Sequence, residues 1–332
     1  MKFSVIITTF NRAGTIPMCM DSLINQNFPK SDYEIIIINN NSSDNTEEVI
    51  EKYIKDYPDT EIKYYFIPKP GQVYARQIGI LAAENEILSF TDDDGILSPD
   101  WLKEIRNVFE LNKEAVGVAG KILIKWDEEP PLWIREYENF LGKLNYGDEI
   151  KYSAGLYMNA GNLSIKKNIL IEVGGFNPEM IGEWLMGDGE TGLWLRLKNK
   201  NYIIGWAPKA IMEHYQIAKK NATVEDIKRR FMNNGICIPY NIFAIEKKGY
   251  RVLIWNMFLA LKQAMKWKLN KLKASLKFDE KNEKYSIFRT AFYTAQIKYT
   301  MKIISDKKFR TALTKGDWII KNSDTIKNKV AA

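Results

Sequence analysis

The sequence is poor in cysteine and histidine and has no long apolar run. Its two cysteines among 332 residues, Cys19 and Cys237, are too few and too far apart for a disulfide framework, which fits a reducing compartment. The apolar run 252–261 is about half of the roughly 20 residues that a spanning helix needs. Residues 1–7 lack the apolar region and cleavage site of a signal peptide. We therefore expect a cytoplasmic protein.

Acidic residues are scarce in the C-terminal quarter. Residues 251–332 contain 19 Lys and Arg but six Asp and Glu, a balance of +13, whereas the whole chain carries +7. Residues 1–250 therefore carry −6, and this asymmetry predicts a separate electrostatic role for the tail. Charge alone would allow nucleic acid as a partner. Because no recognition motif accompanies the charge, we expect none.

Apolar runs typical of strands alternate with amphipathic runs typical of helices in the first part of the chain. In order, they are 3–9, 15–26, 33–38, 46–57, 62–67, 73–85 and 86–91. This alternation predicts a doubly wound α/β layer. Ligands of such sheets bind at the carboxyl ends of the strands. We therefore expect the polar residues after these strands, including Asn11, Arg12, 39–44 and 92–94, to share one crevice.

Three adjacent carboxylates, Asp92, Asp93 and Asp94, follow the last of these strands. Adjacent carboxylates repel one another, and a bound cation offsets that repulsion. Oxygen ligands suit Mg²⁺ or Mn²⁺, which in turn bridge phosphate oxygens. The alternatives are a helix N-cap and a solvated acidic turn. The position at a strand end favours the metal site.

An ordered set of segments resembles the successive signatures of the family 2 glycosyltransferases. They are VIITTFNR at 5–12, EIIIINNNSSD at 34–44, GQVYAR at 71–76, FTDDD at 90–94, AGNLSI at 160–165, VGGF at 173–176 and GDGET at 187–191. The resemblance implies a GT-A fold with a doubly wound mixed sheet. It also implies a nucleoside-diphosphate sugar donor, with a UDP-sugar favoured, a divalent cation (Mn²⁺ or Mg²⁺) and inversion at the anomeric carbon.

The same resemblance implies a donor site. Its residues would be Thr8, Phe10, Arg12, Asn39, Asn41, Gln72, Arg76, Asp92 and Asp93. Thr8 and Asn39 would face the nucleobase, and Arg76 would lie near the base or the diphosphate. The family usually has Asp at the position of Asn39. An amide can still pair with a base edge, but the missing charge leaves the base open, and a simple turn residue is the alternative.

The metal ligands implied by the resemblance are Asp94, as the principal ligand, with Asp92 and His214. His214 is the only histidine of the chain, and relatives in this fold sometimes place a histidine near the metal or diphosphate. A lone histidine can equally be structural. For acceptor binding, the candidates are Asn162, in the AGNLSI segment, and Trp184, beside the acidic loop, because aromatic faces suit apolar sugar surfaces. Core packing is the alternative for the tryptophan.

An inverting transfer needs one base to take the proton of the acceptor hydroxyl. Alignment on Leu193 and Arg196 puts Glu190 where the family has its catalytic Asp, with Gly189 in place of the usual preceding Glu. Glu190 is therefore the predicted base. Asp188 is the second candidate and is expected to position the acceptor. Either carboxylate could instead cap the helix that follows.

We divide the chain at 1–95, 96–220 and 221–332. The first two would be the nucleotide-sugar and acceptor halves of the GT-A domain, and the third a basic helical extension. In the extension, 251–277 has apolar residues at three-and-four spacing with interspersed lysines, which is typical of a helix in an anionic membrane interface. The alternative is a helical subdomain that packs on the catalytic core, dimerises or keeps it soluble.

These features together predict an inverting glycosyltransferase that builds a surface glycan, with a glycan or lipid-linked acceptor, on the inner face of the cell membrane. A sugar nucleotidyltransferase and a non-catalytic nucleotide or glycan binder of the same fold are the alternatives. The first lacks support because no glycine- and Arg/Lys-rich triphosphate loop lies near the N-terminus. The second is disfavoured by Asp94 and Glu190. The sequence leaves the oligomeric state open.

Overall fold

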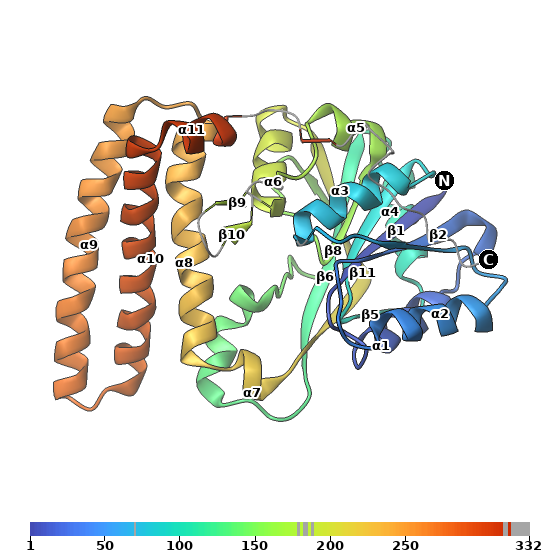
Figure 1. The fold of residues 1–332 in the computed structure, drawn as a ribbon, viewed down its shortest axis with the longest axis horizontal. Helices are drawn as coiled ribbons and strands as arrows, with labels where there is room; N and C mark the ends of the chain where they lie inside the picture. The colour runs from blue at the N-terminus through green and yellow to red at the C-terminus, as the bar shows by residue number, and fades with distance from the viewer. Residues whose placement is uncertain (70, 178–179, 182–184, 187–188, 315–317, 320–332) are drawn as a thin grey trace.

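The computed structural model describes residues 1–69, 71–177, 180–181, 185–186, 189–314 and 318–319. A central sheet flanked by helices forms one part of the molecule, and long helices form an arm beside it (Figure 1). The elements of the first part are β1 (Phe3–Thr9), α1 (Ile16–Ile24), β2 (Tyr33–Asn39), α2 (Thr46–Asp56), β3 (Ile62–Phe66), α3 (Gln72–Ala82), β4 (Ile87–Asp92), β5 (Gly95–Leu97), α4 (Trp101–Leu111), β6 (Ala115–Trp126), the 3₁₀ segment η2 (Leu132–Leu141), β7 (Lys151–Ser153), β8 (Asn162–Lys166), α5 (Lys167–Glu172), β9 (Met180–Ile181), β10 (Leu185–Met186), α6 (Gly189–Asn199) and β11 (Ile203–Gln216).

The sheet has the order β3-β2-β1-β4-β8-β6-β11-β5, and β7 pairs with β11. Strands β3, β2, β1 and β4 are parallel, whereas β8 is antiparallel to both of its neighbours. From β1 the chain moves outward to β2 and β3 and then returns to β4 on the other side of β1. The predicted strands and helices of this region are confirmed. The reversal beside β1 is the point where such sheets bind ligands.

Helices cover both faces of the sheet, and each face has its own apolar core. On one face, Ile7 packs with residues of α1, α2 and α4, including Met20 and Trp101. On the other face, Ile6 packs with α3, α5 and α6, including Ile78 and Leu193. Because both faces are covered, β1 and β2 are buried along their whole length, which fits their largely apolar sequences. The expected boundary near residue 95 falls inside this single sheet.

The arm consists of α8 (Val224–Tyr240), the π-helical turn η3 (Asn241–Ile245), α9 (Tyr250–Leu276), α10 (Glu280–Ser305) and α11 (Lys307–Leu313), and α7 (Ala218–Asn221) leads into it. Helix α8 lies next to the sheet domain, and α9 is farthest from it (Figure 1). Helices α8 and α10 approach closely at Gly235, where a Cβ atom would lie 2.2 Å from the carbonyl oxygen of Phe292. None of the described helices is both long enough and apolar enough to cross a membrane.

Aromatic packing joins the arm to the sheet domain. The ring of Tyr137 in η2 lies 6.1 Å from that of Phe231 in α8 and 5.1 Å from that of Phe288 in α10. All three side chains are buried in one cluster. This contact fixes α8 against the sheet domain, so that residues of α8 contribute to the cleft described next.

Candidate functional site

The site begins where β1 and β4 end side by side. Thr8 and Asp92 are paired in the parallel register, so the loops that follow both strands emerge together. Arg12 in the first loop contacts two carboxylates of the second. Its Nε lies 3.3 Å from Asp93 Oδ1, and its Nη2 lies 3.2 Å from Asp94 Oδ2. The loops after β1 and β4 therefore form the expected crevice, and Arg12 places a positive charge beside Asp93 and Asp94.

Asp93 and Asp94 are both buried, but their pKa values are shifted in opposite directions. Burial raises the pKa of Asp93 to about 7, although Arg12 lies beside it. Burial alone would also raise the pKa of Asp94, but the hydrogen bond and charge of His214, together with Arg12, hold that pKa below its ordinary value. Asp94 is thus the better anion of the two, which suits a ligand for a cation.

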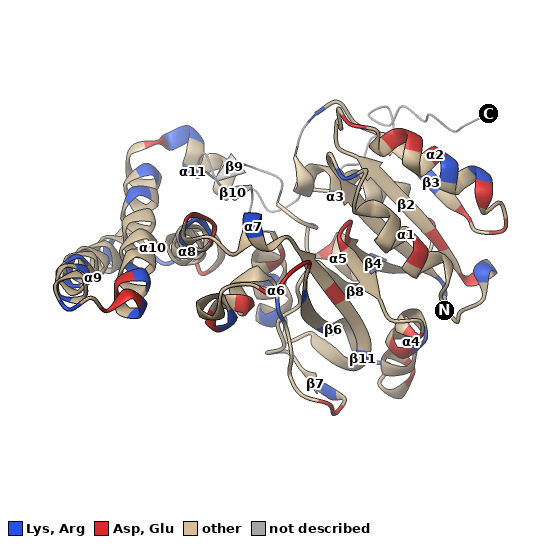
Figure 2. Cartoon of the chain, turned by 90° about the horizontal axis from the view of Figure 1, so that it is seen from below, with Lys and Arg blue, Asp and Glu red and all other residues tan. Residues whose placement is uncertain are grey.

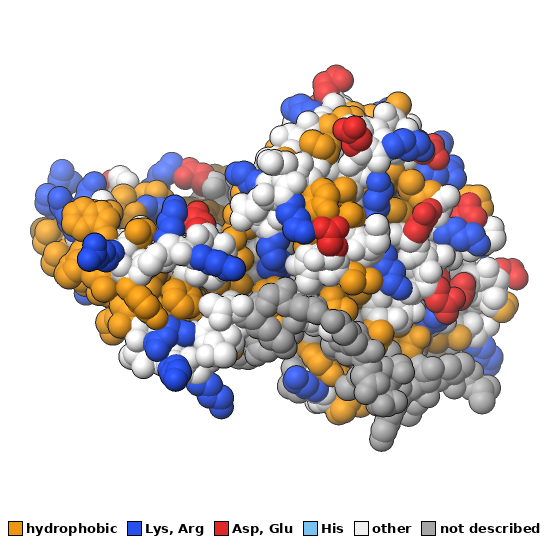
Figure 3. All heavy atoms as spheres, turned by 90° about the horizontal axis from the view of Figure 1, so that it is seen from above, with side chains coloured by type: hydrophobic (Ala, Val, Ile, Leu, Met, Phe, Trp, Pro, Cys, Tyr) orange, Lys and Arg blue, Asp and Glu red, His pale blue; other side chains and the backbone are white. Residues whose placement is uncertain are grey.

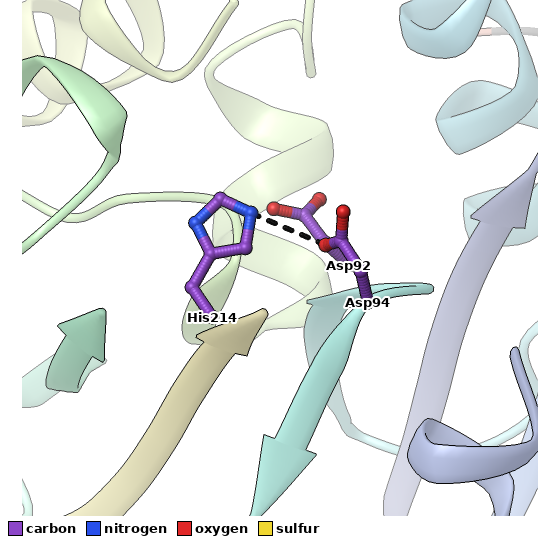
Figure 4. Close-up of side chains that lie close together, drawn as sticks. All are labelled: Asp92, Asp94 and His214. Atoms are coloured by element: carbon purple, nitrogen blue, oxygen red, sulfur yellow. Dashed lines mark ion pairs between the residues drawn. The ribbon is translucent and has the colours of Figure 1, made fainter. Parts of the chain in front are cut away.

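His214 faces the aspartates from the adjacent part of the sheet (Figure 4). Its Nδ1 lies 2.9 Å from the Leu141 carbonyl oxygen, and its Nε2 lies 3.2 Å from Asp94 Oδ1. A carbonyl can only accept, so Nδ1 donates to Leu141, and in the protonated ring Nε2 donates to Asp94. When Nε2 loses that proton, its lone pair becomes a ligand for a cation. Burial lowers the pKa of His214, but Asp94 and Asp92 outweigh this and raise it above 6.5.

One ligand atom each from Asp92, Asp94 and His214 lies within 4.8 Å of the others. Two carboxylates and an imidazole form a donor set that fits Mn²⁺ well and Mg²⁺ through its oxygens. The hydrogen bond from His214 to the Leu141 carbonyl fixes the ring orientation, as the outer partners of metal-binding histidines commonly do. The residues present therefore fit the divalent cation that the sequence predicts.

Arg76 connects this cluster to the predicted base. It is 7% exposed, with Nη2 at 3.2 Å from Asp92 Oδ1 and Nη1 at 4.0 Å from Glu190 Oε2. Glu190 lies in the first turn of α6, and its Oε1 accepts a hydrogen bond of 3.2 Å from the hydroxyl of Tyr157. Burial, followed by the charge of Glu190, raises the pKa of Tyr157 well above its ordinary value. Tyr157 therefore stays a hydrogen-bond donor to the carboxylate.

These groups line one cleft of about 1000 Å³, to which Arg76, Asp92, Glu190 and His214 all contribute. Next to it, a hollow of about 290 Å³ is lined by Arg12 and the three aspartates. Helix α8 closes both: Arg229 and Arg230 line the cleft and the hollow alike. Sequence reasoning missed Tyr157 and the two arginines. They belong to no motif, and only the packing of α8 brings the arginines to the site.

One predicted acceptor residue is placed differently. Asn162 is 1% exposed, and its amide nitrogen donates to the carbonyl oxygens of Lys121 and Ala210, at 3.0 and 2.9 Å. Its side-chain oxygen accepts from the indole of Trp101 at 2.8 Å. The side chain therefore ties β8 to β6, β11 and α4 inside the core. The polar atoms of Asn162 are thus occupied inside the core, and its contact with an acceptor stays a prediction.

The side chain of Asn39 also makes its hydrogen bonds inside the protein. It is 1% exposed; its amide donates to the Tyr64 hydroxyl at 2.9 Å, and its carbonyl accepts from the Ser42 backbone at 2.9 Å. The hydrogen bond from Ser42 is the one expected of a turn residue. Contact between Asn39 and a nucleobase stays a prediction. Asn41 in the same loop has a positive φ of 65°, which asparagine tolerates better than most residues.

The remaining predicted donor residues surround the crevice. Thr8 is nearly buried beside Asp92, and Phe10 is 52% exposed at the end of β1. Gln72 begins α3 and lines both the cleft and the hollow. Their roles in donor binding stay predictions. Asp188 and Trp184, predicted to position the acceptor, lie outside the described residues.

Comparison with known proteins shows which family the chain resembles. The model of the family described as "Glycosyl transferase family 2" matches residues 4–176. A Campylobacter jejuni protein named GalNAc(5)-diNAcBac-PP-undecaprenol beta-1,3-glucosyltransferase is 28% identical over 316 residues, 93% of this chain and 88% of that protein. Several other curated relatives are covered only in part: the aligned segments span 19%, 56% and 38% of the first three.

Solved structures show the fold. Mannosyltransferase PcManGT from Pyrobaculum calidifontis, in complex with GDP-Man and Mn²⁺, aligns with a TM-score of 0.62 at 16% identity, over 92% of this chain and 88% of that one. S. aureus TarS 1-349 in complex with UDP-GlcNAc aligns with a TM-score of 0.52 at 15% identity, over 91% and 92%. The predicted GT-A fold is confirmed. Since the family model covers more than half of the chain, the protein belongs to glycosyl transferase family 2.

Proposed function

We propose that the protein is an inverting glycosyltransferase that moves a sugar from a nucleoside-diphosphate sugar to an acceptor hydroxyl of a growing surface glycan. The observation that carries the proposal is the position of Arg76, which contacts Asp92 on one side and Glu190 on the other within one cleft. A cation-binding end and a candidate base thus lie a single side chain apart. A sugar held between them would have the leaving diphosphate on one side and the attacking hydroxyl on the other.

The donor end of the cleft would hold the diphosphate. Asp92, Asp94 and His214 would bind Mn²⁺ or Mg²⁺, which neutralises the charge that develops on the leaving diphosphate. Arg12 lies 3.2 Å from Asp94 and would keep that carboxylate ionised and oriented. A UDP-sugar is the favoured donor, and TarS, which has the same fold, binds UDP-GlcNAc.

Glu190 would act as the base. As the acceptor oxygen forms its bond to the anomeric carbon, the Glu190 carboxylate takes the hydroxyl proton, and the bond from that carbon to the diphosphate oxygen breaks. The nucleoside diphosphate leaves, and the configuration inverts. The hydrogen bond from Tyr157 and the nearby Arg76 hold the carboxylate in place, at 3.2 and 4.0 Å. Asp188 is the second candidate for the base and would position the acceptor.

The acceptor is proposed to be a glycan or a lipid-linked glycan. The name of the Campylobacter jejuni relative describes glucosyl transfer to an undecaprenol-linked saccharide, and that similarity extends over 93% of this chain. The cleft is large enough for this class of ligand, because 1000 Å³ is at the upper end of the range for small-molecule sites. Its α8 wall supplies Arg229, Arg230 and Asn233, which can donate hydrogen bonds to sugar hydroxyls or phosphates.

The test is to incubate the protein with UDP-, GDP- and dTDP-sugars and Mn²⁺ and to identify the products by mass spectrometry. We expect a nucleoside diphosphate and a free or transferred sugar. Pyrophosphate as the product would indicate nucleotidyl transfer instead, and binding without turnover would indicate a binding protein. Either result contradicts the proposal.

The cation site is tested with Asp94→Asn. This change keeps the shape of the side chain and removes its charge, so Mn²⁺-dependent donor binding measured by calorimetry should be lost. Asp59→Asn is the matched control, because Asp59 is an exposed carboxylate outside both cavities. Equal affinity in the wild type and in Asp94→Asn would overturn the assignment of Asp94.

A further inference from the structure

Helix α9 is the outermost helix of the arm (Figure 1). Its exposed face is rich in large apolar side chains. The helix packs inward through small and apolar residues such as Leu253, Ala260 and Ala264, which are 0, 1 and 7% exposed. On the opposite side, large apolar side chains recur at intervals of three and four residues and are 37 to 82% exposed. They are Ile254, Phe258, Leu261, Met265, Leu269, Leu272 and Leu276, here called the α9 stripe.

Lysines border the α9 stripe on both sides. Lys262, Lys266, Lys273 and Lys277 each directly follow a stripe residue, and Lys268 and Lys271 each directly precede one. Because one residue turns a helix by about 100°, these two sets lie on opposite edges of the stripe. Figure 3 shows apolar surface with basic side chains around it at this end of the molecule, and Figure 2 shows basic residues around α9, which is seen there nearly end-on.

The lysines of α9 have no acidic residue beside them within the helix, although Glu283 of α10 lines a groove with Lys268 and Lys271. The helix contains no Asp or Glu along its 27 residues. In the part of the chain that the structure describes, these lysines make no ion pair; the nearest pairs in sequence involve Lys248, Lys281 and Lys284. An exposed apolar surface of this extent marks an interaction site. Because lysines border it, we expect the partner to carry negative charge.

The charge pattern decides between a lipid surface and a second copy of the chain. If two α9 stripes packed together, lysines of both copies would border the same interface without an acidic residue on either helix, and like charges at such positions are repulsive. An anionic bilayer instead accepts apolar side chains at the acyl boundary, while lysine stems bend so that the ammonium groups reach the phosphates. Trp255, 64% exposed beside the stripe, is a residue type enriched at that boundary.

We propose that the α9 stripe and its lysines dock the protein on an anionic membrane, with α9 lying flat in the interface. The helix is about 40 Å long, so the contact is extended rather than a point anchor. Helices α8 and α10 separate α9 from the sheet domain (Figure 1), and α8 forms a wall of the cleft. Docking through α9 would therefore leave the cleft uncovered, with α8 and α10 between it and the lipid surface. This inference does not depend on the proposed reaction, since the stripe shares no residue with the cleft.

The test measures co-sedimentation of the full chain with vesicles of phosphatidylcholine, with and without phosphatidylglycerol. Binding is expected only with the anionic lipid. Lys266→Gln with Lys273→Gln should lower the partition coefficient about 25-fold, because each lysine near an anionic surface is worth about 1 kcal/mol, or about five-fold. Met265→Glu with Leu269→Glu should abolish binding. Both residues are about 60% exposed, so circular dichroism should show an unchanged fold.

Leu111→Glu is the matched control, because Leu111 is 63% exposed on α4, away from the arm. It should bind vesicles like the wild type, and all variants should hydrolyse a nucleotide sugar at the wild-type rate. Equal binding to neutral and anionic vesicles, or an equal loss in Leu111→Glu, would overturn the proposal. The proposal would also be overturned if the wild type bound no vesicles and instead sedimented as a dimer that Leu269→Glu dissociates. If the wild type bound anionic vesicles but hydrolysed no nucleotide sugar, this result would count against the proposed reaction and not against membrane docking.

Discussion

Replacing Glu190 with glutamine separates its chemical role from its structural one. Glutamine has nearly the same shape and keeps an oxygen that can accept the 3.2 Å hydrogen bond from Tyr157. The change removes the carboxylate charge, which lies 4.0 Å from Arg76 and is 27% exposed. A partly solvated pair at this distance contributes at most about 1 kcal/mol. We therefore expect the free energy of unfolding of Glu190→Gln to stay within about 1 kcal/mol of the wild type.

The effect on rate should be much larger. An amide cannot take the proton from the attacking hydroxyl, and general base catalysis contributes about 10² to 10⁴ in rate. This corresponds to about 3 to 5 kcal/mol in the activation barrier. Because Asp92, Asp94 and His214 are untouched, Mn²⁺-dependent donor binding should change little. The variant should therefore bind donor but turn it over slowly.

The assay is the release of nucleoside diphosphate from the best donor of the panel, with water or a sugar acceptor as the nucleophile, alongside calorimetric donor binding. Glu172→Gln is a control of the same chemistry, because Glu172 pairs with Lys200 at 2.6 Å on the surface of the sheet domain. That variant should keep the wild-type rate. If Glu190→Gln retained more than about a tenth of the rate, Glu190 would not be the base, and Asp188 would be tested next.

Other perturbations address the cation site, the core and the acid response. In His214→Ala, Mn²⁺ affinity measured by electron paramagnetic resonance with UDP present should fall at least about ten-fold; an unchanged affinity would make the ring structural only. Asn162→Ala leaves three buried partners without a hydrogen bond, so chemical denaturation should show a loss of about 3 to 5 kcal/mol, and a loss below about 1 kcal/mol would contradict this. Burial alone would raise the pKa of Glu34, but hydrogen bonds from Lys63 and Ser4 hold it below its ordinary 4.5. The stability from this carboxylate is therefore present above that pH and is lost as the pH falls through the lowered pKa, and Glu34→Gln should flatten the acid limb of the unfolding free energy.

The first half of the fold could be predicted because its signals are local. Strand β2 has an unbroken apolar sequence from residue 35 to 38, and α2 has apolar residues at helical spacing. Alternation of such segments favours a parallel sheet, and a parallel sheet gathers the residues that follow its strands at one edge. Asp92, Asp94 and Arg12 could therefore be placed together from their positions in the chain. The GDGET motif pointed to Glu190, and the resemblance to relatives of this fold pointed to His214.

Other features depend on contacts between distant segments, for which the sequence carries no local signal. Asn162 lies in a motif that suggested acceptor binding, but β8 is inserted antiparallel between β4 and β6, and this position buries its side chain against Lys121, Ala210 and Trp101. A motif records that a residue type is needed and does not say whether it serves the ligand or the core.

Residue spacing within single segments was enough to establish the strand–helix alternation, the acidic cluster at the end of β4 and the basic amphipathic character of α9. Three other features required the folded chain: Arg76 lies between Asp92 and Glu190, α8 brings Arg229 and Arg230 to the cleft, and the apolar stripe of α9 faces outward. These depend on how helices pack against the sheet and against one another, and packing is set by the combined shape of side chains that are far apart in the chain.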